Sequence, residues 1–498
     1  MINIKRIGSL ALAALLFTST ACTLSVPSDK GGENQNAQIV NAPTEPDTAP
    51  ETDPEEPEAP AEEQFVLAQM DSKYHSYCDG KVYYREYKKS DYAEDIMLYY
   101  GDPFTGGIYN STTPKKLCAL NADGSVETIT EDDPGQGVMY VIDNVLYSQY
   151  FMEDGAEADL NATHVYKYDL NTKEKKDIPG YCEVYGRVGD DLVLLSNSRY
   201  DVTGYVPGIL CLVNPKDYTI SSSFDAGTTY IGSDYDSMYG ILVDSDYSKG
   251  DPEFSAKVFR GKADGTVDTV ASFDPSYFSD WYMGYPEVTC FQTVGNHLFL
   301  NIGYYQGTGH FYQEGMIVDI DITNKSCKKV ADVTTETFYV TEGMDGMFVN
   351  ILDYNFENDK TETICIPVDG EGEMKAEDYS GQQYMKPYFH YGDTNNFKSG
   401  EVSIYTDVAG KPVKLISKSD YDGFGYTLGS EEGVDYDIAN QTELYNVEYA
   451  GNKLFFSIAE MERNSEFDVG WRYTYKVKRF ANFVKDLKTG EVKKLYEE

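Results

Sequence analysis

A unit of short strands and tight turns recurs about every 50 residues along the chain, and this repeat constrains the fold more than any other feature. One copy starts at the turn Asp79-Gly80 with the apolar run Val82-Tyr83-Tyr84, and after an insert it resumes over 117–129. Repeats of about 40 to 50 residues made of short strands are typical of β-propellers. We therefore predict an all-β chain in which residues 65–498 form a β-propeller.

Dipeptides that suit two-residue hairpin turns mark the start of each unit, because such turns need residues that tolerate positive φ. They are expected at Asp79-Gly80, Asp143-Asn144, Asp190-Asp191, near Ser237-Met238, and at Gly295-Asn296, Asp345-Gly346 and Gly451-Asn452. The last interval is about twice the usual one, and a degenerate unit with strands near 384–391, 401–405 and 413–417 fits into it. The count favours eight blades, with seven as the alternative if the weakest copies merge.

Loop length differs between the two faces of the predicted ring. In an up-and-down four-stranded blade, the turns after the first and third strands lie on one face, and the remaining connections lie on the other. Here the first class is tight throughout. The second class is long and covers 99–116, 148–164, 196–208, 244–256, 303–314, 353–361 and 460–472. Because binding residues commonly sit on long loops over a rigid frame, we expect the long-loop face to be functional.

The first 21 residues have the pattern of an export signal. Lys5 and Arg6 precede an apolar run from Leu10 to Phe17, which is too short to span a bilayer. Ser19-Thr20-Ala21 then precede Cys22, as in a bacterial lipobox, although that motif usually has Leu where Ser19 stands. We predict that Cys22 is lipidated and holds the protein at the cell membrane, facing the extracellular side or the cell wall. The alternative is ordinary secretion with Cys22 as an unmodified thiol.

Residues 22–64 are predicted to form a disordered linker. Pro, Glu, Asp, Thr and Ala dominate there, and large apolar residues are nearly absent, so the segment cannot bury enough surface to fold. Proline and repelling carboxylates would extend it to on the order of 100 Å, at about 3 Å per residue. Such a tether would hold the propeller away from a membrane.

The charge balance limits the partners that can be expected. A formal net charge of −42 argues against nucleic acid and against anionic lipid surfaces. Two acidic runs, Asp234, Asp236, Asp244 and Asp246 and then Asp420, Asp422, Asp435 and Asp437, raise the question of calcium, but neither has EF-hand spacing. Solvated loops are the preferred interpretation, and no metal or cofactor is predicted.

Seven cysteines follow Cys22, at positions 78, 118, 182, 211, 290, 327 and 365, and none has zinc-ligand spacing. Six of them fall pairwise within single units, which would allow three disulfides, 78–118, 182–211 and 290–327. The preferred alternative is that they are buried thiols that act as small apolar residues.

The repeats at Asp79-Gly80-Lys81-Val82-Tyr83-Tyr84 and Asp123-Gly124-Ser125 resemble those of extracellular propeller lipoproteins of Gram-positive gut bacteria. These are similar to the propellers of the low-density-lipoprotein receptor and of the Tol translocation protein. The likeness covers about residues 70–498 and rests on the repeat pattern, not on an active-site motif. It implies a propeller on the cell surface and identifies no catalytic residue.

Known catalytic signatures are absent from the sequence: there is no His-Glu-x-x-His, Gly-x-Ser-x-Gly or Gly-x-x-x-x-Gly-Lys motif. His297 lies within an apolar strand and is expected to be structural. One aromatic group is predicted to bind a ligand, because it joins an inter-blade link to the long loop of the next unit: Trp281, Tyr282, Tyr285, Tyr304, Tyr305 and His310. Aromatic faces stack on sugar rings or hold apolar peptide groups.

These observations favour a non-enzymatic cell-surface propeller that binds an unknown protein or glycan. The alternative is an extracellular polysaccharide or peptidoglycan hydrolase or lyase. A basic stretch at Arg472, Lys476, Lys478 and Arg479 is expected to be a strand with one solvated face.

Overall fold

The fold was analysed in a computed structural model, and the structure describes residues 74–86, 88, 96–99, 114–151, 163–201, 204–234, 236–248, 252–278, 285–306, 311–334, 338–343, 346–355, 360–369, 374–375, 388–391, 402–405, 412–430, 440–464 and 472–498. The predicted signal peptide, Cys22 and the linker lie outside these residues. Within them there is no α-helix and no helix that could cross a membrane.

The first half of the described chain forms four sheets, each of four strands in sequence order and each antiparallel throughout. Sheet 1 contains β1 (His75–Cys78), β2 (Lys81–Glu86), β4 (Lys115–Leu120) and β5 (Val126–Asp133). Sheet 2 contains β6 (Gln136–Ile142), β7 (Val145–Phe151), β8 (Thr163–Asp169) and β9 (Lys175–Asp177). Sheet 3 contains β10 (Tyr181–Val188), β11 (Asp191–Ser196), β14 (Leu210–Val213) and β15 (Ile220–Ser223). Sheet 4 contains β16 (Thr229–Ser233), β17 (Ser237–Asp246), β18 (Glu253–Lys262) and β19 (Val267–Phe273).

The second half continues the pattern less regularly. Sheet 5 contains β20 (Glu287–Val294), β21 (His297–Gln306), β22 (Phe311–Asp321) and β23 (Ser326–Val333). Sheet 6 contains β24 (Tyr339–Gly343), β25 (Gly346–Asn355), β26 (Lys360–Pro367) and β27 (Met374–Lys375). Sheet 7 contains β28 (Tyr388–Tyr391), β29 (Val402–Tyr405) and β30 (Pro412–Ile416). Sheet 8 contains β31 (Gly429–Ser430), β32 (Gln441–Ala450), β33 (Lys453–Arg463), β34 (Arg472–Asp486) and β35 (Val492–Glu497), together with β3 (Ile96–Tyr99).

Smaller elements decorate these sheets. β12 (Arg199–Asp201) and β13 (Gly204–Val206) form a separate two-stranded ribbon within the long connection of sheet 3. The short 3-10 helix η3 (Pro275–Phe278) follows sheet 4, and η5 (Lys418–Asp420) and η6 (Asp422–Phe424) lead into sheet 8.

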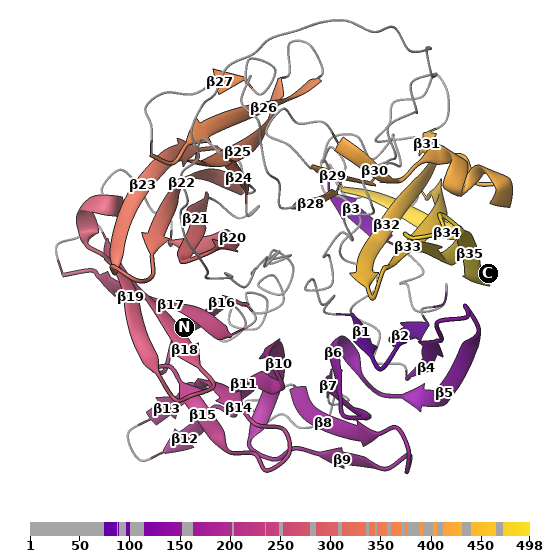
Figure 1. Cartoon of the computed structure of the whole chain (residues 1–498), viewed down its shortest axis with the longest axis horizontal. Helices are drawn as coiled ribbons and strands as arrows, with labels where there is room; N and C mark the ends of the chain where they lie inside the picture. The colour runs from indigo at the N-terminus through magenta and orange to yellow at the C-terminus, as the bar shows by residue number, and fades with distance from the viewer. Residues whose placement is uncertain are drawn as a thin grey trace, which may run out of the picture.

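The sheets are arranged around a common axis, and the chain is a β-propeller (Figure 1). In sheets 1 to 5 the first strand lies near the middle of the ring and the fourth lies at its outer edge (Figure 1). The predicted fold class is thus confirmed, and the degenerate unit appears as sheet 7. Because only three strands of sheet 7 fall within the described residues, the number of blades stays a prediction.

Four of the seven predicted tight turns, at 79–80, 143–144, 295–296 and 451–452, lie where the sequence places them, and several of their residues have left-handed backbone. Asp79 and Gly80 have φ of 50° and 79°, and Asp143 and Asn144 have φ of 51° and 63°. Three of the anchors are shifted. The innermost paired residues are Val188 and Asp191 in sheet 3, Ser233 and Met238 in sheet 4, and Gly343 and Gly346 in sheet 6. The connection between the strands therefore begins one residue before the predicted dipeptide in sheets 3 and 6, and three residues before it in sheet 4.

Both classes of tight turn lie on the same face of the ring, as expected. The backbone N–H of Leu170, in the turn after β8, donates to the carbonyl of Asn144, in the turn after β6, at 3.0 Å. The equivalent bonds join Ile322 to Asn296 at 2.9 Å and Leu487 to Asn452 at 3.1 Å. The long connections therefore leave from the opposite face.

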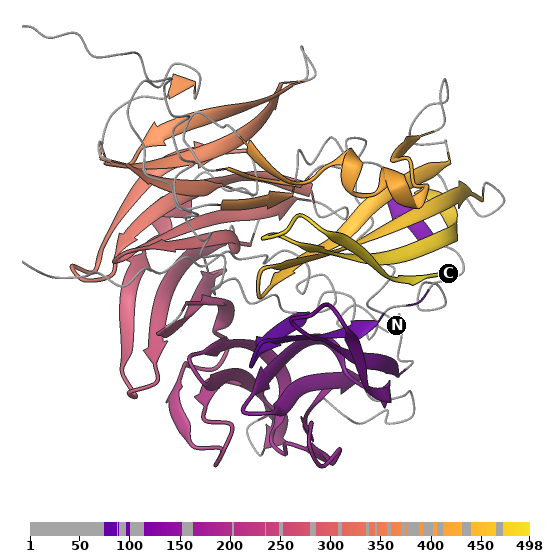
Figure 2. The same ribbon diagram turned by 45° about the vertical axis from the view of Figure 1, so that its right-hand side comes forward.

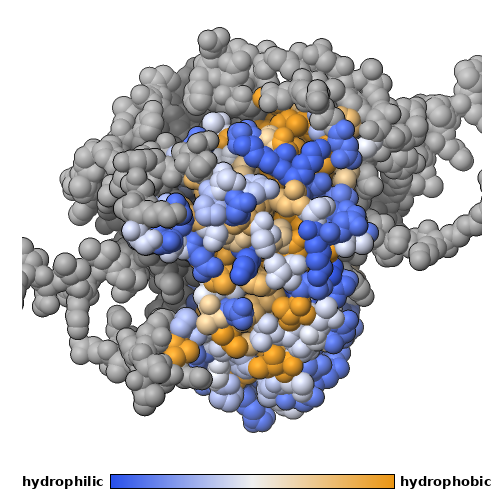
Figure 3. Space-filling model, turned by 90° about the vertical axis from the view of Figure 1, so that its left-hand side faces the viewer, coloured by the Kyte–Doolittle hydropathy of each residue, from blue (hydrophilic) through white to orange (hydrophobic). Residues whose placement is uncertain are grey.

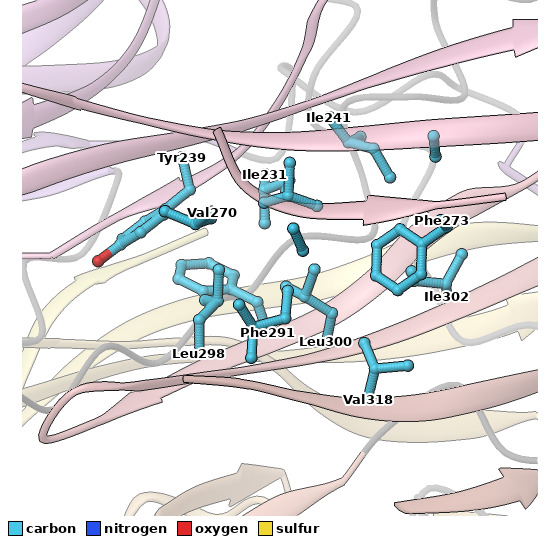
Figure 4. Close-up of a cluster of buried hydrophobic side chains, with 14 of the residues drawn as sticks. Ile231, Tyr239, Ile241, Val270, Phe273, Phe291, Leu298, Leu300, Ile302 and Val318 are labelled. Atoms are coloured by element: carbon cyan, nitrogen blue, oxygen red, sulfur yellow. The ribbon is translucent and has the colours of Figure 1, made fainter. Parts of the chain in front are cut away.

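The core consists of apolar clusters between consecutive sheets, because strand alternation sends one row of side chains to each neighbour. Between sheets 4 and 5, Ile231 and Tyr239 from one sheet pack against Phe291 and Leu298 from the other (Figure 4). Fully burying one such side chain contributes about 1.5–3 kcal/mol. On the side of the molecule that Figure 3 shows, by contrast, the coloured surface has hydrophobic residues scattered among hydrophilic ones.

The first and last sheets close the ring. Tyr84 of β2 and Phe455 of β33 pack in one buried cluster, and sheets 1 and 8 lie side by side in Figure 2. A second link was not predicted: β3, from the long connection of sheet 1, pairs with β34 of sheet 8, Ile96 opposite Tyr475 and Tyr99 opposite Arg472. The N-terminal sheet thus donates a strand to the C-terminal one.

All seven cysteines after Cys22 are free thiols. Four are buried, as preferred from the sequence, whereas Cys78, Cys290 and Cys327 are only partly buried. The alternative disulfides are contradicted, and the topology explains why. Cys182 in β10 and Cys211 in β14 have β11 between them, and Cys290 in β20 and Cys327 in β23 have two strands between them. Strands lie about 4.8 Å apart, so these residues exceed the separation of about 7 Å that a disulfide can bridge.

Candidate ligand-binding rim

The candidate site lies at the long-loop end of the interface between sheets 4 and 5. Three described segments meet there: 243–248 at the end of β17, 252–256 at the start of β18, and 285–289 at the start of β20. We call these segments, with the exposed Tyr247 and Tyr285, the tyrosine rim. It belongs to the face that the sequence predicted to be functional.

Two hairpins hold the rim in place. β17 and β18 pair without interruption as far as Asp246 opposite Glu253, so the chain stays extended up to Tyr247. β20 and β21 pair from Glu287 opposite Gly303, which places Tyr285 just beyond the paired end. Paired strand ends therefore carry the rim, with Tyr247 one residue and Tyr285 two residues beyond them.

Tyr285 is fixed in orientation but open to solvent. Its ring packs edge-on against buried Phe254, with centroids 5.8 Å apart, and its hydroxyl donates to the carbonyl of Val243 at 3.4 Å. The residue is nevertheless 50% exposed, and Tyr247 is 64% exposed. Large aromatic surface left open in this way is available to a ligand.

The electrostatic surroundings of the rim are acidic. The pKa of Tyr285 is raised, first by partial burial and then by the carboxylates of Glu287 and Asp244 and by the Tyr247 hydroxyl. Negative charge therefore lies close to Tyr285. Asp244, Asp246 and Tyr247 are exposed.

Tyr304 lies at the same end of sheet 5 as Tyr285. Its position in β21 is one residue beyond Gly303, which is paired with Glu287. Its side chain is only 7% exposed, and its hydroxyl donates to Glu314 Oε1 at 3.1 Å. Little of the Tyr304 side chain is therefore open to a ligand, and its role in binding stays a prediction.

The other predicted binding residues can be placed only in part. Trp281, Tyr282 and His310 lie outside the described residues. Tyr305 lies in β21 opposite Tyr312, and only its backbone is described. Sequence reasoning did not single out Tyr247, although an aromatic residue at the tip of a polar loop, Asp244-Ser245-Asp246-Tyr247-Ser248, was the available signal.

Calcium binding at the first acidic run is contradicted by the topology. Asp234 and Asp236 lie in the turn before β17, whereas Asp244 and Asp246 lie at the far end of that strand. At about 3.3 Å per residue the two pairs are separated by more than about 20 Å. Among the described residues no group of three or more His, Cys, Asp or Glu could hold a metal ion. Asp435 and Asp437, of the second acidic run, lie outside the described residues.

Two other polar groups could suggest chemistry, but their settings are structural. His297 Nδ1 lies 2.8 Å from Asp319 Oδ1 on the tight-turn face, in strands β21 and β22. Arg85 of β2 and Asp133 of β5, both in sheet 1, form an ion pair at 2.7 Å with side chains 1% exposed. Tyr166 donates to the same aspartate at 2.5 Å. A substrate could not reach this buried network.

No protein-family model and no curated protein matches this chain. Among solved structures, it is similar to apo AztD from Citrobacter koseri, with 11% identity and a TM-score of 0.31, over 63% of this chain and 73% of that one. A putative dipeptidyl aminopeptidase IV from Bacteroides ovatus has 8% identity and a TM-score of 0.36, over 86% and 60%. An oligogalacturonate lyase from Vibrio parahaemolyticus has 10% identity and a TM-score of 0.29, over 82% and 89%. At these scores the matches carry no argument about function.

Proposed function

We propose that this propeller is a non-enzymatic binding module of the cell surface, which recognises a protein or glycan through the tyrosine rim. The observation that carries this proposal is the pair of exposed rings, Tyr247 at 64% and Tyr285 at 50%, on the long-loop face. Because Tyr285 is held by Phe254 and by the Val243 carbonyl, little side-chain entropy would be lost when a ligand binds.

The test is a binding screen with the purified full-length protein against glycan and peptide arrays. A ligand bound by the wild type should bind more weakly to a Tyr247→Ala/Tyr285→Ala variant. Tyr77→Ala is the matched control, since Tyr77 is 46% exposed but lies beside the tight turn of sheet 1. Equal loss of binding in both variants, or in neither, would exclude the rim as the site.

The alternative, an extracellular polysaccharide or peptidoglycan hydrolase or lyase, makes a different prediction. Turnover of a cell-wall polymer by the wild type, abolished by Asp244→Asn but not by Asp332→Asn, would establish catalysis at the rim. Binding without product would support the binding module.

The proposal includes a lipid anchor at Cys22, which follows from the sequence pattern. Metabolic labelling with an alkyne fatty acid should mark the wild-type protein and not Cys22→Ser, which should appear in the medium. Labelling that survives this substitution would contradict the anchor.

A further inference from the structure

The ring is closed where sheet 1 meets sheet 8, and these two sheets come from opposite ends of the described chain (Figure 2). We call their contact the seam. Its apolar part is one cluster of buried residues from both sheets: Val82, Tyr84, Cys118, Leu120, Ala450, Phe455 and Val484. Consecutive sheets follow one another along the chain, whereas among the described strands only β3 carries backbone across the seam. The seam can therefore part with less disturbance of the chain than a junction between consecutive sheets.

One titratable ring lies at the centre of the seam. His75 of β1 pairs directly opposite Tyr84 of β2, so both side chains leave sheet 1 on the same face. Between centroids, the His75 ring lies 4.3 Å from that of Phe455 in sheet 8 and 6.1 Å from that of Tyr84. The Tyr84 and Phe455 rings are 5.4 Å apart. Of these three rings, only that of histidine ordinarily changes its charge between about pH 5 and 8.

The surroundings of His75 favour its neutral form. Its pKa is lowered to about 3, first by burial and then by the positive charge of Arg85 in β2. The faces of aromatic rings attract cations, so Tyr84 and Phe455 would return part of the cost of a charge. Taking an ion out of water costs more than one such contact returns, and the neutral imidazole is therefore the form that fits the closed seam.

Two carboxylates also face the seam. Glu86 lies two residues beyond Tyr84 on the same face of β2, and it pairs with Lys116 at 3.5 Å. Glu448 of β32 lies opposite Phe455. β6, which also packs on β1, contains no charged residue. Glu448 is thus the residue that would oppose an effect of His75 protonation, by pairing with the imidazolium.

We propose that the seam is a pH-sensitive closure of the ring: neutral His75 packs against Tyr84 and Phe455, and its protonation parts sheets 1 and 8 while the other sheets stay together. In the parted state the His75 ring is in water and has the ordinary pKa of 6.5. Proton uptake therefore favours parting by about tenfold for each pH unit below 6.5, down to about pH 3. This inference goes beyond the proposed binding function, since the tyrosine rim lies between sheets 4 and 5.

Two native thiols report on the seam and on a junction elsewhere. Cys118 lies in the seam and Cys211 lies between sheets 2 and 3, and both are 0% exposed. Burial raises the pKa of each to about 11, so their intrinsic reactivities are similar. The full-length protein is treated with 4,4′-dithiodipyridine at about pH 7.5, 6 and 4.5, and mass spectrometry of peptides locates the adducts. Each rate is divided by that of the urea-unfolded protein at the same pH, which gives a protection factor. Between about pH 7.5 and 4.5 the protection of Cys118 should fall by about a hundredfold, and that of Cys211 should not change.

Substitutions assign the effect to His75. His75→Phe keeps an aromatic ring but cannot take up a proton, so the protection of Cys118 should no longer depend on pH. His75→Gln is a second variant that cannot be protonated, and it guards against a packing effect of phenylalanine. His164→Phe is the matched control, because the His164 ring stacks on Tyr150 within sheet 2, at 5.8 Å between centroids, and it should keep the wild-type pH dependence. Protection of Cys211 at about pH 7.5 shows that a variant is folded.

Three results would overturn the proposal. Cys118 that stays protected at about pH 4.5 would mean that the seam does not part, and exposure in Glu448→Gln alone would then show that this carboxylate holds the imidazolium. Exposure of Cys118 and Cys211 together would mean that the whole protein unfolds. A pH dependence that persists in the folded His75 variants would assign the effect to another group.

Discussion

At the scale of single residues, the buried ion pair of Arg85 and Asp133 joins β2 and β5 of sheet 1, and Arg85 also reaches sheet 2. Arg85 donates to Asp133 at 2.7 Å, to the Gly137 carbonyl at 2.7 Å and to Ser148 at 2.7 Å. The last two bonds connect β2 of sheet 1 with β6 and β7 of sheet 2. Removing one partner of a buried pair leaves the other charge desolvated and alone, which is costly.

We expect Arg85→Ala to lower the free energy of unfolding by about 3–5 kcal/mol, measured by urea denaturation. Lys81→Ala is the control in the same strand. Lys81 bonds Glu127 at 3.0 Å, but both side chains are exposed, so the loss should stay below about 1 kcal/mol. Similar losses from the two substitutions would contradict a structural role for the buried pair.

A second residue-scale prediction concerns Asp234, whose pKa is raised to about 6, mainly by burial. Its carboxylate accepts the Tyr239 hydroxyl at 2.7 Å and two backbone N–H groups, but these bonds offset only part of the desolvation. In the unfolded chain this carboxyl group ionises near its ordinary pKa of 3.8. Above that pH, folding must either bury the charge of Asp234 or take up a proton, so the free energy of unfolding falls.

Relative to Asp234→Asn, the wild type should therefore lose stability as the pH rises from about 4 to about 6, and the difference should be constant above that range. The change should be on the order of 2–3 kcal/mol, at 1.36 kcal/mol per pKa unit. Urea denaturation of both proteins across this range measures it. A difference that grows in the opposite direction, or none, would refute the raised pKa.

At the scale of elements, glycine allows the inner strands of neighbouring sheets to approach each other. A Cβ placed on Gly232 in β16 would lie 1.9 Å from the Phe291 ring of β20. Phe291 belongs to the cluster between sheets 4 and 5, so this contact sets the distance between the two sheets that carry the tyrosine rim.

Gly232→Ala should destabilise the protein by about 1–3 kcal/mol, because overpacking forces the ring from its place. The substitution Phe291→Leu places a smaller side chain at the same contact. In that background, Gly232→Ala should lower the free energy of unfolding by less than it does in the wild type. Gly423→Ala is the control, since no atom lies within 4 Å of its added Cβ. Additive effects of the two substitutions in thermal or urea unfolding would show that the residues do not interact.

The elements also show how far the sequence could predict this structure. Turns such as Asp79-Gly80 were predictable because positive φ is a local requirement, readable from two residues. The position of the turn in sheet 3 could not be predicted to within one residue. Two overlapping pairs, Gly189-Asp190 and Asp190-Asp191, both consist of residues that suit a tight turn. The pairing of Arg85 with Asp133 could not be predicted from the sequence, because it depends on where two distant strands end. Of the predicted site, Tyr285 is found exposed at the expected edge, while Tyr247 was missed.

At the scale of the whole molecule, β3 is the element that depends most on the ring being closed. It leaves sheet 1 and pairs with residues 472–475 of β34, which are not covered by β35, since β35 pairs only with residues 481–485. The first and last sheets are therefore joined by backbone hydrogen bonds as well as by the cluster around Tyr84 and Phe455.

Proline substitution in β3, at Met97 and Leu98 together, should remove backbone donors from this pairing. We expect faster hydrogen exchange at residues 472–475 and a lower urea midpoint. The same pair of prolines at Tyr200 and Tyr205, in the ribbon β12–β13, should leave residues 472–475 protected, because that ribbon pairs only with itself. Unchanged exchange in the β3 variant would mean that the strand does not close the ring.

The account depends most on the claim that this ring binds its ligand at the long-loop edge between sheets 4 and 5. Hydrogen exchange of the full-length protein, with and without a ligand identified on the glycan and peptide arrays, tests that claim in a single experiment. Protection should appear in 243–256 and 285–306 and not in the tight turns at 79–80, 143–144 and 451–452. Protection confined to those turns, or spread evenly over the ring, would contradict it.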